Sequence, residues 1–145
     1  MFAIMRPDSW NLPLLVHVAG AMALVGALVV VLALAAHGLR RGDDAAALAR
    51  PVFRTLLIGV LPAYLVMRVG AEWIYSEEAL GDAAWTTIGY VTSELGLLLI
   101  LIATVLAWRA SRRQHGDASR AIAVLSAVLI VGYLVAIWAM TAKPA

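Results

Sequence analysis

Four long apolar runs, separated by short polar stretches, make up most of the chain. They cover residues 11–36, 52–74, 84–108 and 121–140. At a rise of about 1.5 Å per residue, a helix of this length crosses the ~30 Å hydrocarbon core of a bilayer. The pattern predicts an all-α membrane protein, in which residues 1–145 form one domain, a four-helix transmembrane bundle.

The stretches between the runs are short, which favours an up-down-up-down bundle with sequential helices side by side. Each half of the chain is a helix, a basic loop and a second helix, and the triplet YLV recurs at residues 64–66 and 133–135. Two hairpins of the same orientation would form a parallel repeat about an axis along the membrane normal. Chance similarity between apolar helices is the other explanation, and the sequence leaves both open.

Arginines gather in two of the connecting stretches. Because basic loops stay on the cytoplasmic side, we expect both termini outside, with the chain crossing the inner (plasma) membrane of a bacterial cell several times. The expected cytoplasmic loops hold, after the first and third runs respectively, Arg40, Arg41, Arg50 and Arg54, and Arg109, Arg112, Arg113 and Arg120.

The composition agrees with this class. The chain is 63% hydrophobic and 14% charged, with a mean hydropathy of +0.91, which is too apolar for a soluble domain of this size. The lack of cysteine excludes disulfides, thiolate metal sites and cysteine nucleophiles. A sequence pI near 9.4 does not indicate nucleic-acid binding, since topology explains the basic residues. The lipid bilayer is the expected partner.

Two local features of the apolar runs bear on packing. Ala19, Ala23 and Ala27 recur at four-residue spacing, and small residues let helices approach closely in lipid. They serve packing within the bundle or, alternatively, a homodimer or another membrane-protein partner. Pro62 lies inside the second run, where it removes one backbone hydrogen bond and is expected to bend the helix.

Charged residues inside the apolar runs carry most of the functional information. A charge in hydrocarbon costs at least ~2.5–3.5 kcal/mol on insertion scales, so we expect Arg68 and Glu94 to face each other. Counting along the helices, these two residues and His17 lie roughly 8–13 Å below the outer interface. Aromatic rings prefer that interface, which we place at Trp10, Trp73, Tyr75 and Trp85.

Helical spacing extends this set of polar residues. Tyr64, Arg68 and Glu72 recur at i, i+4 and i+8 and share one helix face. Thr87, Tyr90 and Glu94 share a face in the same way, at i, i+3 and i+7. Both stripes are expected to point into the bundle, because lipid-facing stripes should be apolar. The predicted ligand-binding residues are His17, Tyr64, Arg68, Glu72, Tyr90, Glu94 and Tyr133.

The charged residues and His17 also have purely structural explanations. An Arg68–Glu94 salt bridge completed by tyrosine hydroxyls could simply fix helix register, and Glu72 could pair with Arg68 locally. His17 is either a neutral packing residue, a proton-exchange partner of Glu94, or a ligand of haem b or a metal. A second axial ligand from the same chain would be Met22 or Met67, since His37 and His115 lie near the cytoplasmic end, and a dimeric site is the alternative.

Known catalytic motifs are absent from the sequence. There is no glycine-rich phosphate loop, H-E-x-x-H or G-x-S-x-G. The serines at positions 93, 111, 119 and 126 have no histidine base near them in sequence. We therefore assign no catalytic residue and no firm cofactor, and the sequence favours a protein that is not an enzyme.

The first apolar run resembles a known group. Its segment LLVHVAGA at residues 14–21, followed by Gly26, is similar to the first-helix motif of small bacterial four-span membrane proteins of the copper-resistance D-like group. The resemblance covers about one helix and the four-span layout. It implies copper handling or haem binding through His17, although the chain lacks a methionine-rich outer segment.

Three functions are compatible with the sequence. The first is an outward-facing intramembrane site that binds or transports a small polar or anionic ligand, with or without proton coupling. Haem or metal binding through His17 is the second. The third is a non-catalytic bundle that acts as a structural subunit or partner of another membrane protein.

Overall fold

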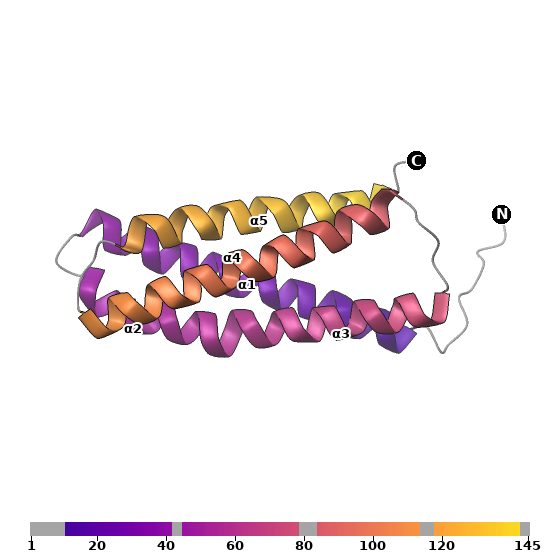
Figure 1. Ribbon diagram of the computed structural model, residues 1–145, viewed down its shortest axis with the longest axis horizontal. Helices are drawn as coiled ribbons and strands as arrows, with labels where there is room; N and C mark the ends of the chain where they lie inside the picture. Colours follow the sequence, from indigo (N-terminus) through magenta and orange to yellow (C-terminus); the bar gives the residue numbers. More distant parts are fainter. Residues whose placement is uncertain (1–10, 42–44, 79–83, 114–117, 143–145) are drawn as a thin grey trace.

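The structure is a computed structural model that describes residues 11–41, 45–78, 84–113 and 118–142, and all of these except Arg41 are helical. The elements are α1 (Asn11–Arg40), α2 (Ala45–Thr55), the π-helical turn η3 (Leu56–Val60), α3 (Leu61–Glu78), α4 (Ala84–Arg113) and α5 (Ala118–Ala142). Because α2, η3 and α3 follow one another without a break, they form one long rod (Figure 1). The prediction of an all-α bundle is confirmed.

Among the described residues, four helices are long and apolar enough to cross a membrane: Leu12–Arg40, Ala46–Ser76, Thr86–Arg112 and Ala118–Ala142. Their outward faces are apolar as well, as Met22 (71% exposed) and Ile58 (73% exposed) illustrate. Such faces would be unfavourable in water and suit contact with lipid tails. The chain is a multi-pass membrane protein.

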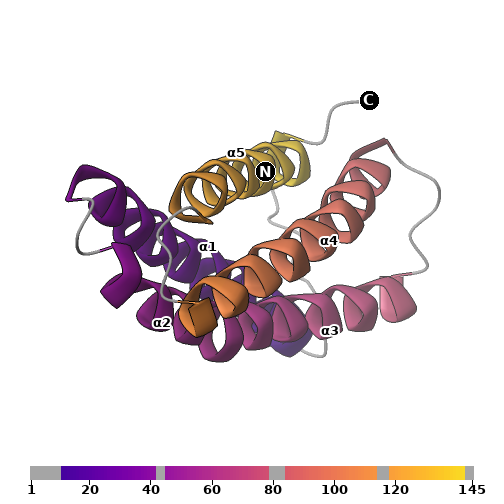
Figure 2. The same ribbon diagram turned by 60° about the vertical axis from the view of Figure 1, so that its left-hand side comes forward.

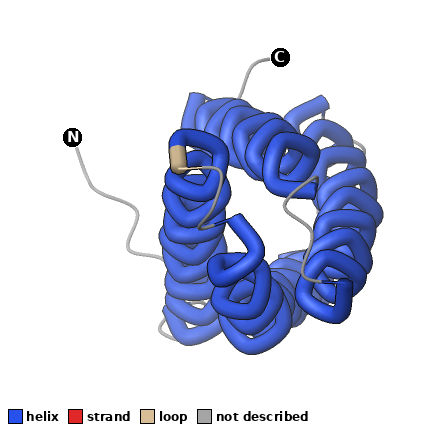
Figure 3. The backbone as a smooth tube through the Cα atoms, turned by 90° about the vertical axis from the view of Figure 1, so that its left-hand side faces the viewer, coloured by secondary structure: helices blue, strands red, loops and turns tan. Residues whose placement is uncertain are grey.

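The helices form a ring when viewed along the bundle (Figure 3), and buried side chains fill its centre. Leucine and valine side chains from α1, η3 and α5 fill that centre against small residues of α4. Ala103 and Ala107 of α4 are fully buried, and such short side chains let helices pack closely. The central residues include Leu24, Leu28, Val31, Leu56, Val60, Ile100 and Leu129.

Sequential spans lie side by side, but not all of them along their whole length. α1 packs along α3 and α5, and α4 packs along α5 and, at its far end, α2. α3 and α4 diverge from each other toward one end of the bundle (Figure 2) and make few contacts. The predicted neighbours 52–74 and 84–108 therefore pack together through α2 and η3, and they separate toward the end where α3 finishes and α4 begins.

Helices extend past the apolar runs at the arginine-rich end. The prediction that arginines 50 and 54 belong to a loop is wrong, since α2 begins at Ala45 and carries both on its exposed face. Its opposite face buries Ala49 and Val52, so the segment is an amphipathic extension of the span. We name this region the arginine end; its described side chains include Arg40, Arg50, Arg54, Arg109, Arg112 and Arg120.

We name the opposite region the terminal end; there α1 and α4 begin and α3 and α5 finish. Trp73 and Tyr75 lie in the last turns of α3 and are partly exposed, at 40% and 41%. This matches the position expected for interfacial aromatic residues. Trp10 and the side chain of Trp85 lie outside the described part.

A π-helical turn precedes Pro62. The N–H of Leu61 donates to the carbonyl oxygen of Leu56, five residues back. Proline has no N–H to donate, and a widened turn is one way for a helix to accommodate it. The sequence predicted a bend at Pro62, and the structure has a π-helical turn just before this residue.

The small residues of α1 divide between two faces. Ala27 packs against Gly59: a Cβ atom added to this glycine would lie 3.5 Å from the Ala27 methyl group. Ala19 and Ala23 face outward, so the prediction that they pack within the bundle is wrong. Gly20, on the other face of the helix, makes the close contact instead.

Candidate functional site

α1 and α3 approach each other closely at the terminal end. A Cβ atom on Gly70 would lie 2.5 Å from the backbone nitrogen of His17, and one on Gly20 would collide with the backbone of Met67. Only glycine fits at these two positions. Gly20 of α1 contacts Met67 of α3, and Gly70 of α3 contacts His17 of α1. The two antiparallel helices therefore lock together at two points, one helical turn apart.

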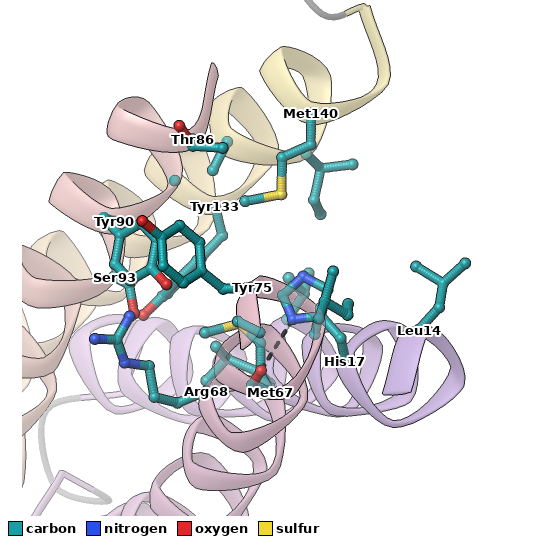
Figure 4. Close-up of a pocket in the computed structure, with 18 residues that line it drawn as sticks. Leu14, His17, Met67, Arg68, Tyr75, Thr86, Tyr90, Ser93, Tyr133 and Met140 are labelled. Carbon is teal, nitrogen blue, oxygen red and sulfur yellow. Dashed lines mark hydrogen bonds between the residues drawn. The ribbon is translucent and has the colours of Figure 1, made fainter. Parts of the chain in front are cut away.

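This contact places the His17 ring beside the opposite backbone. The Nδ1 atom lies 2.9 Å from the carbonyl oxygen of Met67. Because a carbonyl only accepts hydrogen bonds, Nδ1 carries the hydrogen in this pair. Figure 4 shows the other ring nitrogen, Nε2, turned away from that carbonyl and toward the middle of the cavity described below. The bond fixes the ring orientation, and in the neutral ring it leaves Nε2 as an acceptor.

The predicted ion pair forms, together with its alternative. The Nη2 atom of Arg68 lies 2.9 Å from Oε1 of Glu94 and 3.0 Å from Oε1 of Glu72. The arginine therefore joins two carboxylates, one from its own helix and one from α4. The group carries a formal charge of −1 when all three residues are ionised.

The prediction that both polar stripes point into the bundle is wrong for Glu72, Thr87 and Glu94, whereas Tyr64 is buried and Arg68 and Tyr90 line the cavity described below. The side chain of Glu94 is 61% exposed and that of Glu72 is 51% exposed, and Thr87 also faces outward. Successive helical residues are about 100° apart. The buried face of α4 follows Thr86, Gly89, Ser93, Gly96 and Ile100.

Tyr64 has a different place from the one expected. Its side chain is 2% exposed, and its hydroxyl lies 3.1 Å from Oγ of Ser93 and donates to the Ser93 carbonyl oxygen at 3.4 Å. The contact joins α3 to α4 below the cavity, and Tyr64 does not line the cavity. It supports the site from beneath.

Aromatic rings continue the bridge between α3 and α4. The guanidinium carbon of Arg68 lies 4.7 Å from the ring centroid of Tyr90, a favourable cation–π distance. Tyr90 in turn meets Tyr75 edge to face, with centroids 5.8 Å apart and ring planes at 83°. We call this group, Arg68, Tyr75 and Tyr90, the side-chain bridge.

A cavity of about 210 Å³ lies at the terminal end among α1, α3, α4 and α5 (Figure 4). Four predicted ligand-binding residues line it: His17, Arg68, Tyr90 and Tyr133. Glu72 and Glu94 lie outside it, on the far side of Arg68. An engineered apolar cavity of about 150 Å³ can hold benzene, so a one-ring molecule fits this space.

Several lining residues were not predicted. Thr86 and Ser93 lie seven residues apart on the buried face of α4. This spacing, which places two residues on the same helix face, is the sequence feature that could have predicted them. Tyr75 follows Arg68 by the same interval. Met140 reaches the cavity from α5, and nothing in its sequence context marks it.

The Tyr133 hydroxyl is the least satisfied group in this wall. The side chain is 5% exposed, and among the described residues its oxygen has no hydrogen-bond partner. Gly96 makes room for it, because a Cβ atom there would collide with the hydroxyl. Buried polar groups nearly always have a partner, so this oxygen indicates a place for a water molecule or a ligand group.

The described side chains around His17 do not form a complete metal or haem site. The described residues contain no cluster of three His, Cys, Asp or Glu side chains that could hold a metal ion. Met22 faces outward at 71% exposure, so it cannot pair with His17, whereas Met67 and Met140 share the cavity with it. At about 210 Å³ the cavity is below the ~300–1,000 Å³ of drug-sized pockets, and a haem does not fit.

Comparison with known proteins gives no family for the chain: no protein-family model, no curated protein and no solved structure matches it. Its function therefore has to be argued from the site itself.

Proposed function

We propose that the protein binds a small polar molecule in the cavity at the terminal end, within the membrane. The observation that carries the proposal is the buried Tyr133 hydroxyl, which lacks a partner among the described residues in the wall of a cavity of about 210 Å³. His17 offers a second polar contact, because Met67 engages only one of its ring nitrogens. A ligand with a hydroxyl or amine group could donate to Nε2 and accept from Tyr133.

The charges favour an uncharged polar ligand over an anion. Arg68 already contacts two carboxylates at 2.9 and 3.0 Å. An anion would have to replace one of them, or a proton would have to be taken up, which would make His17 cationic or would neutralise Glu72 or Glu94. Anion binding, and any transport built on it, therefore requires coupled proton uptake.

We infer that the terminal end faces the outside of the cell. The described arginines at the arginine end follow the positive-inside pattern of cytoplasmic loops. In this orientation the cavity lies in the outer half of the inner membrane, and both chain ends are outside.

A set of one-ring fluorinated probes tests the binding site. We expect 4-fluorobenzyl alcohol to give a saturable bound signal in 19F NMR of the purified protein in lipid nanodiscs, with weaker binding of 4-fluorobenzenesulfonate. Ala136→Leu, which places three more carbons in the cavity wall, should abolish the signal. Ala121→Leu on the exposed face of the same helix is the matched control and should keep it.

A saturable signal that survives Ala136→Leu would contradict binding in this cavity. If no probe in a broader one-ring set binds the wild-type protein, the alternative of a structural subunit or partner protein gains support.

A second candidate is a soft-metal site. Metal-ligating histidines commonly donate their other ring N–H to a backbone carbonyl, as His17 does toward Met67, and thioethers such as those of Met67 and Met140 are soft donors. The resemblance of the first helix to the copper-resistance D-like group points to the same histidine. Metal-dependent thermal stabilisation that His17→Phe removes would favour this candidate over the first.

A further inference from the structure

We propose that the cavity exchanges its ligand with the bilayer through the seam between α3 and α4, so that the ligand is a membrane-dissolved amphipath with an uncharged or cationic head. This inference rests on the proposed function and adds its substrate class and route.

The seam is the side of the cavity with the weakest helix packing. The glycine contacts described above lock α1 to α3, while Gly96 receives Tyr133 and Gly89 receives Met140 between α4 and α5. α1 also packs along α5. By contrast, α3 and α4 diverge toward the terminal end (Figure 2), and the Tyr64–Ser93 contact closes the seam from below.

The wall at the seam is one side chain thick. Each member of the side-chain bridge lines the cavity, and each is also partly exposed, with Tyr75 at 41% and Arg68 at 26%. The contacts across the seam include an ion pair, a cation–π contact and an edge-to-face ring pair. Rotamer changes in these three side chains would open the wall without moving a helix, and exposed side chains make such changes rapidly.

The depth of the seam determines what lies outside it. Arg68 is eight residues before Ser76, where its candidate span ends, and Glu94 is eight residues after Thr86, where its span begins. At about 1.5 Å per residue both lie roughly 12 Å inside the span. A ligand leaving here enters the leaflet on the terminal side.

The charges at the seam select the head group. Glu72 and Glu94 flank Arg68 on the exposed side, which leaves a formal charge of −1 in a region of low dielectric. That field repels anionic head groups. The carboxylate oxygens accept hydrogen bonds, so they can guide a hydroxyl or ammonium group past Arg68.

Bridging the seam chemically tests the route. The chain has no cysteine, and the carboxylates of Glu72 and Glu94 both lie within 3.0 Å of one nitrogen. The double variant Glu72→Cys/Glu94→Cys can therefore be joined by a short bis-methanethiosulfonate. The 19F exchange rate of 4-fluorobenzyl alcohol is measured in nanodiscs before bridging, after bridging and after reduction.

We expect bridging to slow exchange at least tenfold, with an unchanged Kd, and reduction to restore the rate. The same variant capped with methyl methanethiosulfonate carries the bulk without the bridge and should exchange at nearly the unbridged rate. An exchange rate that bridging leaves unchanged would overturn the lateral route. Absence of probe binding by the wild-type protein is a different result, which would refute the proposed function itself.

A measurement on the wild-type protein covers the case in which the double variant does not fold. Lipids spin-labelled in mid-chain should broaden the bound 19F signal at least threefold more than a water-soluble gadolinium chelate does. Stronger broadening by the chelate would place the opening in water and contradict the proposal.

Discussion

The Nδ1 atom of His17 lies 2.9 Å from the carbonyl oxygen of Met67, at the point where α1 and α3 come closest. The two features depend on each other. Without glycine at positions 20 and 70 the helices could not approach so far, and the imidazole of one helix could not reach the backbone of the other. The packing of two apolar helices thus orients a titratable ring toward the cavity.

Gly20→Ala should destabilise the protein by about 1–3 kcal/mol, the usual cost of overpacking, because the new methyl group would meet the backbone of Met67. The free energy of reversible unfolding in mixed micelles measures this. Gly26→Ala on the same helix is the control, since a Cβ there has nothing within 4 Å. Alanine should cost nothing at position 26, and equal losses at both positions would contradict the close contact.

Arg68→Gln should cost more stability than Glu94→Gln. Removing the arginine leaves two carboxylates at hydrocarbon depth, each costing ~2.5–3.5 kcal/mol unless it takes up a proton, whereas removing Glu94 leaves Arg68 its contact with Glu72. The double variant should lose at least about 1 kcal/mol less than the sum of the singles. Additive losses in the unfolding assay would show that the pair does not interact.

Binding of the anionic probe should depend on pH. If an anion binds only with uptake of a proton by His17 or a glutamate, the affinity for 4-fluorobenzenesulfonate rises as the pH falls from about 8 to 5, the range in which imidazole charge changes. The sulfonate stays ionised throughout, and 4-fluorobenzyl alcohol, which needs no proton, is the control. An affinity for the sulfonate that stays flat over this range would remove proton coupling.

The orientation can be tested with single cysteines at matched serines. Ser76 lies in the last turns of α3 at the terminal end, and Ser119 lies in the first turn of α5 at the arginine end. An impermeant thiol reagent added outside intact cells should label Ser76→Cys and spare Ser119→Cys. The reverse pattern would invert the topology.

The sequence was sufficient for the four spans and for the ion pair, because hydrophobic length and the cost of a charge in lipid are local properties. The sequence was not sufficient to predict that the Glu94 side chain points out of the bundle. Spacing along α4 relates its residues to each other, but which face turns inward depends on where Gly96 meets Tyr133 on α5. Contacts between helices set that face, and they cannot be read from one helix.

The same limit applies to the cavity. Met140 and Tyr75 line it where α3 and α4 diverge, and no turn signal in the sequence marks that divergence. The YLV triplets at residues 64–66 and 133–135 do show one shared pattern, a buried tyrosine followed by two exposed residues. This supports the parallel repeat, which stays a prediction.

The most direct test of the binding site is Tyr133→Phe, because its two effects should have opposite directions. The change removes a buried hydroxyl that has no partner among the described residues, so the unliganded protein should be as stable or more stable, by up to about 1–3 kcal/mol. Because the hydroxyl is proposed to bond the ligand, its removal should at the same time weaken 4-fluorobenzyl alcohol binding about tenfold, the effect of one lost hydrogen bond of about 1.4 kcal/mol. Stability and 19F-detected affinity are measured on the same sample. An unchanged affinity would contradict the account.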